Sequence, residues 1–236
     1  MTSPTAAQVV RRSALEAIHL ALGARWVDEH VRWPAGYAAV DSSAEAEALT
    51  AAAGLAEIGP LDEWLLRGPG ALAAVARLKT GGPAPAVGRL LASHVPGQPV
   101  GLWVLGPDEV LLVAPVAGST LAALAAELAS DDLSVIEMTG AWTTLRLAGP
   151  AAPAILAELC PVDTTPETMA PADLLQAPLA GVRAFIARQD AGARCGYTMM
   201  IARDEAAYVW DAIRHIGAPH GLTPVGPAAI APGGPR

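Results

Sequence analysis

The sequence predicts an α+β fold made of two similar halves, each with helices packed on an antiparallel sheet. Two observations lead to this prediction. A strand followed by Gly-Pro and a helix occurs twice, at residues 64–78 and 144–159, and the turn-forming residues 106–109 separate two short apolar runs as in a β-hairpin. Proline suits the first turn of a helix because its missing N–H needs no partner there. The glycine before it lets the chain turn sharply out of the strand.

Each element of the first half follows from a local signal. Apolar side chains recur at helical spacing in residues 15–23 and stop at a glycine, while residues 43–53 begin with a serine N-cap and acidic side chains. Residues 79–101 are rich in glycine and proline and are predicted as a loop with at most one short element at 88–93. The other elements expected here are strands at 64–67, 102–105 and 110–114 and helices at 71–78 and 121–129.

The second half repeats the pattern and closes with a long helix that ends at Gly217. We expect strands at 135–138, 144–147, 182–188 and 197–202 and helices at 151–159 and 205–216. The domain is therefore expected over residues 15–228, divided into halves at about 15–130 and 131–228. Residues 1–14 and the Pro- and Gly-rich residues 229–236 are expected to be tails.

The composition argues against several classes of protein. The net charge is −8, and the 15 lysines and arginines are scattered, so no nucleic-acid partner is expected. The richest apolar stretch, residues 111–128, is interrupted by Pro115 and Glu127, and no apolar run suited to a signal peptide follows residues 1–12. We therefore expect no membrane association and a cytoplasmic location. The two cysteines, Cys160 and Cys195, cannot by themselves form a zinc site.

One ungapped stretch, residues 54–71, reads GLAEIGPLDEWLLRGPGA. It resembles the "GLFD-SHM…GPDA" segment that opens the folate-binding domain of the glycine-cleavage T-protein (aminomethyltransferase) family. Further similar segments follow in order, including ALGARWV at 21–27, YVWDAI at 208–213 and GLTPVG at 221–226. Residues 135–162 are similar to the γ subunit of heterotetrameric sarcosine oxidase, a short form of the same domain. The resemblance implies a T-protein-like folate-binding domain that lacks the family's C-terminal barrel domain.

The departures from the family pattern bear on its chemistry. Where the family has adjacent carboxylates that position tetrahydrofolate, this chain has Val100-Gly101, and neither residue can hold a charge. The methionine of the family's "SHM" is Leu61 and its histidine is Pro60. The glutamate of the "GYTGE-GFE" loop is missing on either alignment of Tyr197, with the tyrosine or with the later phenylalanine of that loop. A flat apolar slot without these partners holds a pterin poorly.

The resemblance implies a ligand site between the two halves. Its expected cofactor-binding residues are Leu61, Val100, Trp103 and Tyr197, and we expect tetrahydrofolate to bind weakly if it binds. No catalytic residue is identified, and no metal site is expected.

Two polar residues are weak catalytic candidates. Glu57 stands where the family usually has aspartate, and its alternative role is that of a strand-end carboxylate that caps nearby amides. His94 belongs to the segment that faces the folate mouth in the family, and its alternative is a solvated loop histidine.

Three functions follow from these features. The first is a degenerate tetrahydrofolate-binding-type subunit of an amine-demethylating or one-carbon oxidoreductase complex, without catalysis of its own. Its expected partner is a flavin-dependent oxidase, a T-protein-like chain or a second copy of itself. The alternative is an active tetrahydrofolate-dependent aminomethyl- or methyltransferase with a rebuilt pocket that uses Glu57, His94 or Tyr197. The third is a free-standing folate- or amine-binding protein.

Overall fold

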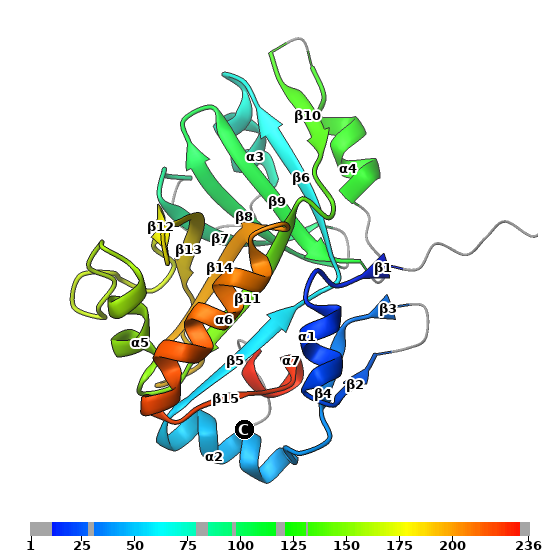
Figure 1. Ribbon diagram of the computed structural model, residues 1–236. Coiled ribbons are helices and arrows are strands. Elements are labelled where there is room, and N and C mark those ends of the chain that lie inside the picture. The colour runs from blue at the N-terminus through cyan, green and yellow to red at the C-terminus, as the bar shows by residue number, and fades with distance from the viewer. Residues whose placement is uncertain are drawn as a thin grey trace, which may run out of the picture.

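A computed structural model describes residues 11–27, 31–78, 85–95, 98–116, 121–130 and 132–231. Two β-sheets pack against each other, and helices cover the outer face of each (Figure 1). No helix in these ranges is both long enough and apolar enough to cross a membrane. The predicted α+β class with two similar halves is confirmed.

The first sheet has five antiparallel strands. In spatial order they are β10 (Ser134–Glu137), β6 (Leu61–Arg67), β9 (Glu109–Pro115), β8 (Gln98–Gly106) and β7 (Arg89–Val95). Its outer face packs against α3 (Ala71–Leu78) and α4 (Leu121–Leu128) through aliphatic side chains such as Leu66, Leu102 and Leu112.

The second sheet has six strands and is antiparallel except for its last pair. In order they are β12 (Leu174–Leu179), β13 (Val182–Arg188), β14 (Gly196–Ala202), β11 (Trp142–Ala148), β5 (Ala53–Ile58) and β15 (Leu222–Pro224). Its outer face packs against α5 (Ala152–Leu159) and α6 (Ala206–Gly217). Between the sheets lies a third core that includes Leu111 and Leu65 from one and Met200 from the other.

Smaller elements surround the second sheet. They are β1 (Arg11–Arg12), α1 (Glu16–Ala21), β2 (Ala24–Trp26), β3 (Val31–Arg32), β4 (Pro34–Tyr37), α2 (Ser42–Ala51), the 3-10 turn Ala218–His220 and α7 (Pro227–Ile230). Asp41 caps α2, because its side chain accepts hydrogen bonds from the N–H groups of Ser43 and Ala44. α7 packs over β5 near the middle of Figure 1.

The two halves repeat the same order of elements and exchange one strand. Each runs through a leading strand, a Gly-Pro strand, a helix, a three-stranded meander and a second helix. The leading strand β5 pairs with β11 of the second half, and the leading strand β10 pairs with β6 of the first. The segments 15–130 and 131–228 are therefore interlocked, since each gives its first strand to the other's sheet.

The glycines of the two Gly-Pro turns make this exchange sterically feasible. Gly68 and Gly149 have φ of +139° and +128°, in the region that favours glycine. A Cβ on Gly68 would overlap the backbone carbonyl of Asp132, just before β10, and a Cβ on Gly149 would overlap that of Ala52, just before β5. Both glycines therefore let the exchanged strand enter next to the turn.

Some predicted boundaries were wrong. The segment predicted as loop contains β7 and the start of β8, because Leu90 and Leu91 are buried and the ladder accommodates Pro99 and Gly101 among its paired residues. Strand β12 was not predicted, and it lies at a sheet edge, where Pro178 is tolerated. The expected tail from residue 229 includes the end of α7, where Ile230 is fully buried.

Candidate functional site

Three adjoining cavities lie between the two sheets, and Leu61 lines all of them. The central cavity has a volume of about 420 Å³. A second cavity of about 380 Å³, which we name the crossover cavity, lies where the chain passes from each leading strand to its Gly-Pro strand. The central cavity and the crossover cavity share Ile58, Leu61 and Thr144. On another side the central cavity adjoins a cavity of about 630 Å³ beside β7 and β13. Together they offer a connected space large enough for an organic ligand.

The central cavity has one apolar wall and one polar wall. Side chains of the five-stranded sheet are apolar there, whereas those of the six-stranded sheet carry hydroxyl, amide and guanidinium groups, and α7 with Ala231 closes a third side. The lining residues are Ile58, Leu61, Leu90, Gly101, Trp103, Val113, Thr144, Arg146, Gln189, Thr198, Pro227, Ala228 and Ala231. Among them Arg146 is the one charged side chain.

Arg146 is a buried cation whose hydrogen-bond partners are neutral. Its residue is 1 % exposed. Nε donates to the carbonyl of Ile230 at 2.7 Å, Nη1 to the hydroxyl of Thr198 at 2.8 Å and Nη2 to the carbonyl of Gln189 at 2.7 Å. Burial lowers the pKa of Arg146 to about 10, so the side chain still carries its charge at neutral pH. Among the described residues, no carboxylate bonds this guanidinium directly.

Asp190 favours the charge of Arg146 electrostatically but is bound elsewhere. Its carboxylate accepts hydrogen bonds from Nε and Nη2 of Arg188 at 3.1 and 2.7 Å and from the N–H of Gly196 at 3.2 Å. This ion pair raises the pKa of the Arg188 guanidinium. Asp190 is therefore neutralised by Arg188 and is not a direct counter-ion of Arg146.

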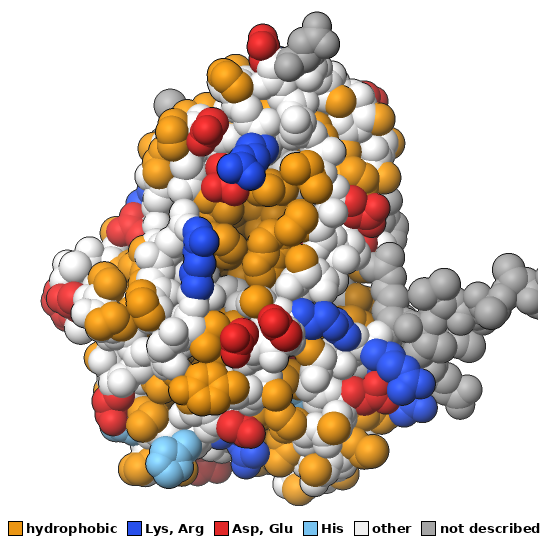
Figure 2. Space-filling model, turned by 45° about the horizontal axis from the view of Figure 1, so that its top comes forward, with side chains coloured by type: hydrophobic (Ala, Val, Ile, Leu, Met, Phe, Trp, Pro, Cys, Tyr) orange, Lys and Arg blue, Asp and Glu red, His pale blue; other side chains and the backbone are white. Residues whose placement is uncertain are grey.

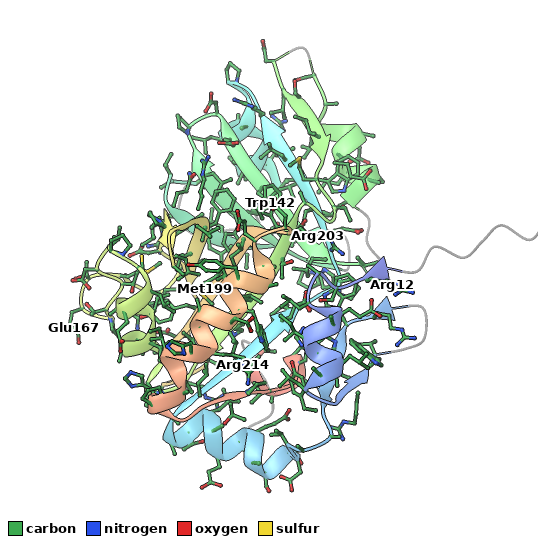
Figure 3. All side chains as sticks on the ribbon, in the orientation of Figure 1. Arg12, Trp142, Glu167, Met199, Arg203 and Arg214 are labelled. Carbon is green, nitrogen blue, oxygen red and sulfur yellow. The ribbon has the colours of Figure 1, made fainter. Side chains whose placement is uncertain are left out.

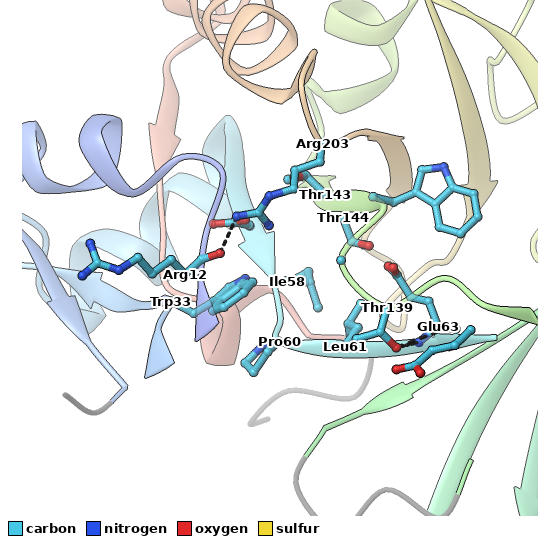
Figure 4. A pocket seen from close by; sticks show the side chains of 14 residues that line it. Arg12, Trp33, Ile58, Pro60, Leu61, Glu63, Thr139, Thr143, Thr144 and Arg203 are labelled. Atoms are coloured by element: carbon cyan, nitrogen blue, oxygen red, sulfur yellow. Dashed lines mark hydrogen bonds between the residues drawn. The ribbon is translucent and has the colours of Figure 1, made fainter. Parts of the chain in front are cut away.

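The crossover cavity contains two buried oxygen atoms without a partner in the described residues, Oε2 of Glu63 and Oγ1 of Thr144. Figure 4 shows both side chains on the same side of the cavity, with Thr139 Oγ1 accepting a hydrogen bond from the Glu63 N–H at 3.1 Å. Burial raises the pKa of Glu63 to about 8, although the N–H groups of Gly140 and Trp142 act in the opposite direction. Glu63 is therefore a protonated acid at neutral pH.

The other wall of the crossover cavity is basic and aromatic. Figure 3 shows Arg12 and Arg203 in this part of the molecule, and Nη2 of Arg203 donates to the backbone carbonyl of Arg12 at 2.7 Å. Trp142 also lines the cavity, next to Glu63, and its backbone N–H donates to the carboxyl group of Glu63. Trp33 from the loop before β4 also lines this cavity. No cluster of His, Cys, Asp or Glu suited to a metal ion is found within the described part of the chain.

Glu57 belongs to a buried network that ties the N-terminal segment to β5. Its Oε2 accepts from the Ser13 hydroxyl at 2.5 Å and contacts His19 Nε2 at 2.8 Å, while Nδ1 of His19 contacts the Tyr37 hydroxyl at 2.9 Å. Burial raises the pKa of Tyr37. Ile58 lines both the central and the crossover cavity, and Glu57 is among the residues that line the crossover cavity. Its carboxylate is nevertheless buried and engaged by Ser13 and His19.

The structure brings two of the four expected cofactor-binding residues to the central cavity. Leu61 and Trp103 line it. Val100 packs into the core beneath α3 and α4 and also lines the cavity beside β7. On β8 its neighbour Gly101 faces the central cavity instead.

Tyr197 does not line the central cavity, in contrast to the prediction. It is fully buried in the core beneath α5 and α6 and donates a hydrogen bond to the Thr164 carbonyl at 2.6 Å, so its neighbour Thr198 faces the cavity instead. The other catalytic candidate, His94, lies on β7 opposite Pro99, and its side chain lies outside the described part.

Arg146 and Glu63 were missed by sequence reasoning. A signal was present for Arg146, because a single charged residue stands between Leu145 and Leu147 in an otherwise uncharged strand. Such a residue is either an edge residue or a buried charge with a role. Nothing in the local sequence distinguishes Glu63, which is buried, from a glutamate exposed to solvent.

A separate hollow opens between the sheets at the molecular surface. Figure 2 shows hydrophobic side chains gathered in a hollow with charged residues around it. The cavity there has a volume of about 280 Å³, with Glu109 and Arg183 among its lining residues. The others are Leu65, Leu105, Met138, Trp142, Phe185, Met200 and Ala202. We call it the apolar hollow.

Comparison with known proteins gives one family and two kinds of relative. The profile of the GCVT N-terminal domain matches residues 15–231. The aminomethyltransferase of Saccharopolyspora erythraea is 29 % identical over 225 residues, which cover 92 % of this chain and 60 % of that protein. The sarcosine oxidase subunit gamma of Corynebacterium sp. strain P-1 is 39 % identical over 99 residues, 42 % of this chain and 47 % of that subunit.

Solved structures agree on the fold. Aminomethyltransferase T of the glycine cleavage system from Bartonella henselae has a TM-score of 0.77 at 20 % identity, covering 93 % of this chain and 60 % of that one. A chain of the heterotetrameric sarcosine oxidase from Corynebacterium sp. U-96 has a TM-score of 0.66 at 21 % identity, covering 90 % and 97 %. The chain thus spans about 60 % of the length of the aminomethyltransferases that it matches.

Proposed function

The chain belongs to the GCVT N-terminal domain family, and from this premise we propose that it is a T-protein-like subunit of an amine-demethylating or one-carbon oxidase complex, without aminomethyl transfer activity of its own. The family relation rests on nearly the whole chain, and the oxidase relation on the 99 residues shared with a sarcosine oxidase gamma subunit. The cytoplasm remains the expected location.

The observation that carries the proposal is the chemistry of the central cavity. No carboxylate is present among the described residues that line it. Where the family resemblance implies adjacent carboxylates, Val100 is packed into an apolar core and Gly101 has no side chain. A reaction that develops positive charge on an amine carbon finds no anionic group there to stabilise it.

The alternative, a transferase with a rebuilt pocket, gains little from the geometry. It was expected to use Glu57, His94 or Tyr197. The Glu57 carboxylate is engaged by Ser13 and His19, and Tyr197 lies on the outer face of its sheet. Transfer that depends on these two side chains would require both to leave buried hydrogen bonds.

The residues of the cavity fit tetrahydrofolate only in part. Leu61 and Trp103 offer apolar surface to an aromatic ring system, and the Thr144 hydroxyl beside them has no hydrogen-bond partner among the described residues. A pterin also needs a charged acceptor for its N–H groups, and none is found among the described residues that line the cavity. Losing one charged hydrogen bond costs about 1.5–3 kcal/mol, or roughly 10- to 150-fold in affinity.

Calorimetry and a turnover assay test this part of the proposal. We expect tetrahydrofolate to bind the isolated chain more weakly than about 1 μM and no tetrahydrofolate-dependent ammonia release above background. Submicromolar binding, or turnover that Glu57→Ala abolishes while a surface variant such as Glu127→Ala does not, would favour the transferase.

The partner is tested separately. We propose a flavin-dependent oxidase subunit or a T-protein-like chain, and a second copy of this chain as the fallback. The apolar hollow is the surface that we expect such a partner to cover, because its lining is mostly apolar and also includes Glu109 and Arg183. Tagged protein purified from its native host is expected to bring down such a subunit, identified by mass spectrometry. Strictly monomeric protein in light scattering at tens of micromolar, with no co-purifying subunit, would contradict the proposal.

A further inference from the structure

The most demanding feature of the central cavity is the buried charge of Arg146. Taking a guanidinium out of water is costly unless a counter-ion or a full set of hydrogen bonds replaces the solvent. The three bonds to Ile230, Thr198 and Gln189 use one N–H on each nitrogen. A guanidinium has five N–H groups, so one on Nη1 and one on Nη2 have no partner among the described residues.

These two N–H groups belong to a side chain that lines a cavity of about 420 Å³. The planar fork of a guanidinium matches a carboxylate, which can accept two parallel hydrogen bonds from it. No protein carboxylate is available for this role, because none lines the cavity in the described part of the chain and Asp190 is bound by Arg188. The missing counter-ion is therefore of a kind that a ligand can supply.

The opposite wall indicates what the rest of such a ligand is. Leu61, Leu90, Trp103 and Val113 present apolar surface, and Trp103 as a residue is only 3 % exposed. A cavity of about 150 Å³ lined by such residues is enough for benzene, so the central cavity has room for two fused rings. Flat apolar groups stack well against an indole.

We propose that the central cavity binds an organic anion that has a flat apolar body and one carboxylate, and that Arg146 anchors the carboxylate. This anion site is separate from the surface expected to bind an oxidase partner, and binding of the anion does not require that partner. The ligand approaches Arg146 from the apolar wall, with Thr144 beside it on the same face of β11.

The test compares a carboxylate with its neutral isostere. Calorimetric titration of the full chain with 2-naphthoate and with 2-naphthamide measures the contribution of the charge, since the two have nearly the same shape. We expect wild-type protein to prefer the carboxylate by about tenfold or more. Equal affinities, or no binding of either compound at millimolar concentration, would overturn the proposal.

Two variants separate the anchor from the wall. Arg146→Leu should remove the preference for 2-naphthoate and leave 2-naphthamide binding within about threefold, because a leucine keeps the cavity apolar. Trp103→Leu is the matched control and should weaken both compounds to a similar extent. A preference that survives in Arg146→Leu would overturn the proposal.

Folding of the variants does not limit the test. Arg146→Leu leaves the carbonyls of Ile230 and Gln189 without this donor, which costs about 1–3 kcal/mol for each group, so circular dichroism must show that the variant is folded. Should Arg146→Leu fail to fold, Arg146→Lys keeps the charge without the fork and should reduce the preference severalfold. The wild-type comparison of the two compounds decides independently of any variant.

Discussion

The Gly-Pro strands β6 and β11 occupy equivalent places in the two halves of the molecule. Both have seven residues, both end directly before a glycine of positive φ, and both pair with the leading strand of the other half. Counting back from Gly68 and Gly149, the third residue is Leu65 in one strand and Arg146 in the other. The backbone is repeated while the side chain facing the space between the sheets changes from apolar to charged.

The surroundings differ accordingly. Leu65 lines the apolar hollow at the surface and packs into the core between the two sheets. Arg146 lies in the central cavity, where the carbonyls of Ile230 and Gln189 accept its hydrogen bonds. The Gly-Pro turns and the pairing of the strands therefore set the architecture of both halves. The side chain at this one position determines which half has an anion site.

The largest expected effect tests the shared backbone. Gly68→Ala and Gly149→Ala should each destabilise the protein by about 3 kcal/mol or more, since both residues have a φ that alanine rarely adopts and a backbone carbonyl in the way. Urea unfolding measures the loss. Gly192→Ala, with φ +63° and no atom within 4 Å of its Cβ, is the control and should cost about 1 kcal/mol. A marked difference between Gly68 and Gly149 would break the equivalence of the halves.

A second prediction concerns the fifth residue before each glycine, Glu63 in β6. Its pKa is raised from 4.5 to about 8, so the folded protein holds a proton that the unfolded chain releases. Stability should be unaffected by Glu63 below about pH 4.5 and should fall by about 1.4 kcal/mol per pH unit towards pH 8. Glu63→Gln should remove this decline when unfolding is measured across that range. Parallel curves for the two proteins would show that Glu63 titrates normally.

The smallest effect belongs to Thr144, the equivalent of Glu63 in β11. Its hydroxyl is buried and has no partner in the described residues, so Thr144→Val should change stability by less than about 1 kcal/mol or raise it slightly. This change should not depend on pH, in contrast to Glu63→Gln. A loss of several kcal/mol on thermal unfolding would reveal a partner for the hydroxyl.

The repeat could be predicted from the sequence because its signal is local: each half contains a Gly-Pro pair, Gly68-Pro69 and Gly149-Pro150. It did not find the exchange of β5 and β10, since nothing within a strand states which sheet it joins. The alternation of side chains along each strand also determines which residues line the central cavity. Tyr197 and Val100 each lie one residue away from the position that faces the central cavity, and a shift by one residue places a side chain on the opposite face.

Arg146 shows why the site was harder to predict than the fold. Its burial depends on carbonyls of Gln189 and Ile230, which are far away in sequence and come together only in the folded chain. Local sequence indicates a strand with one charge, and only tertiary structure shows that this charge faces a cavity.

A crystal structure of the protein with 2-naphthoate would locate the bound anion. We expect the carboxylate to lie within hydrogen-bond distance of the guanidinium of Arg146, with the rings against Trp103 in the central cavity. The compound found instead in the apolar hollow beside Leu65, with the central cavity free of it, would contradict the claim that the two equivalent positions differ in function.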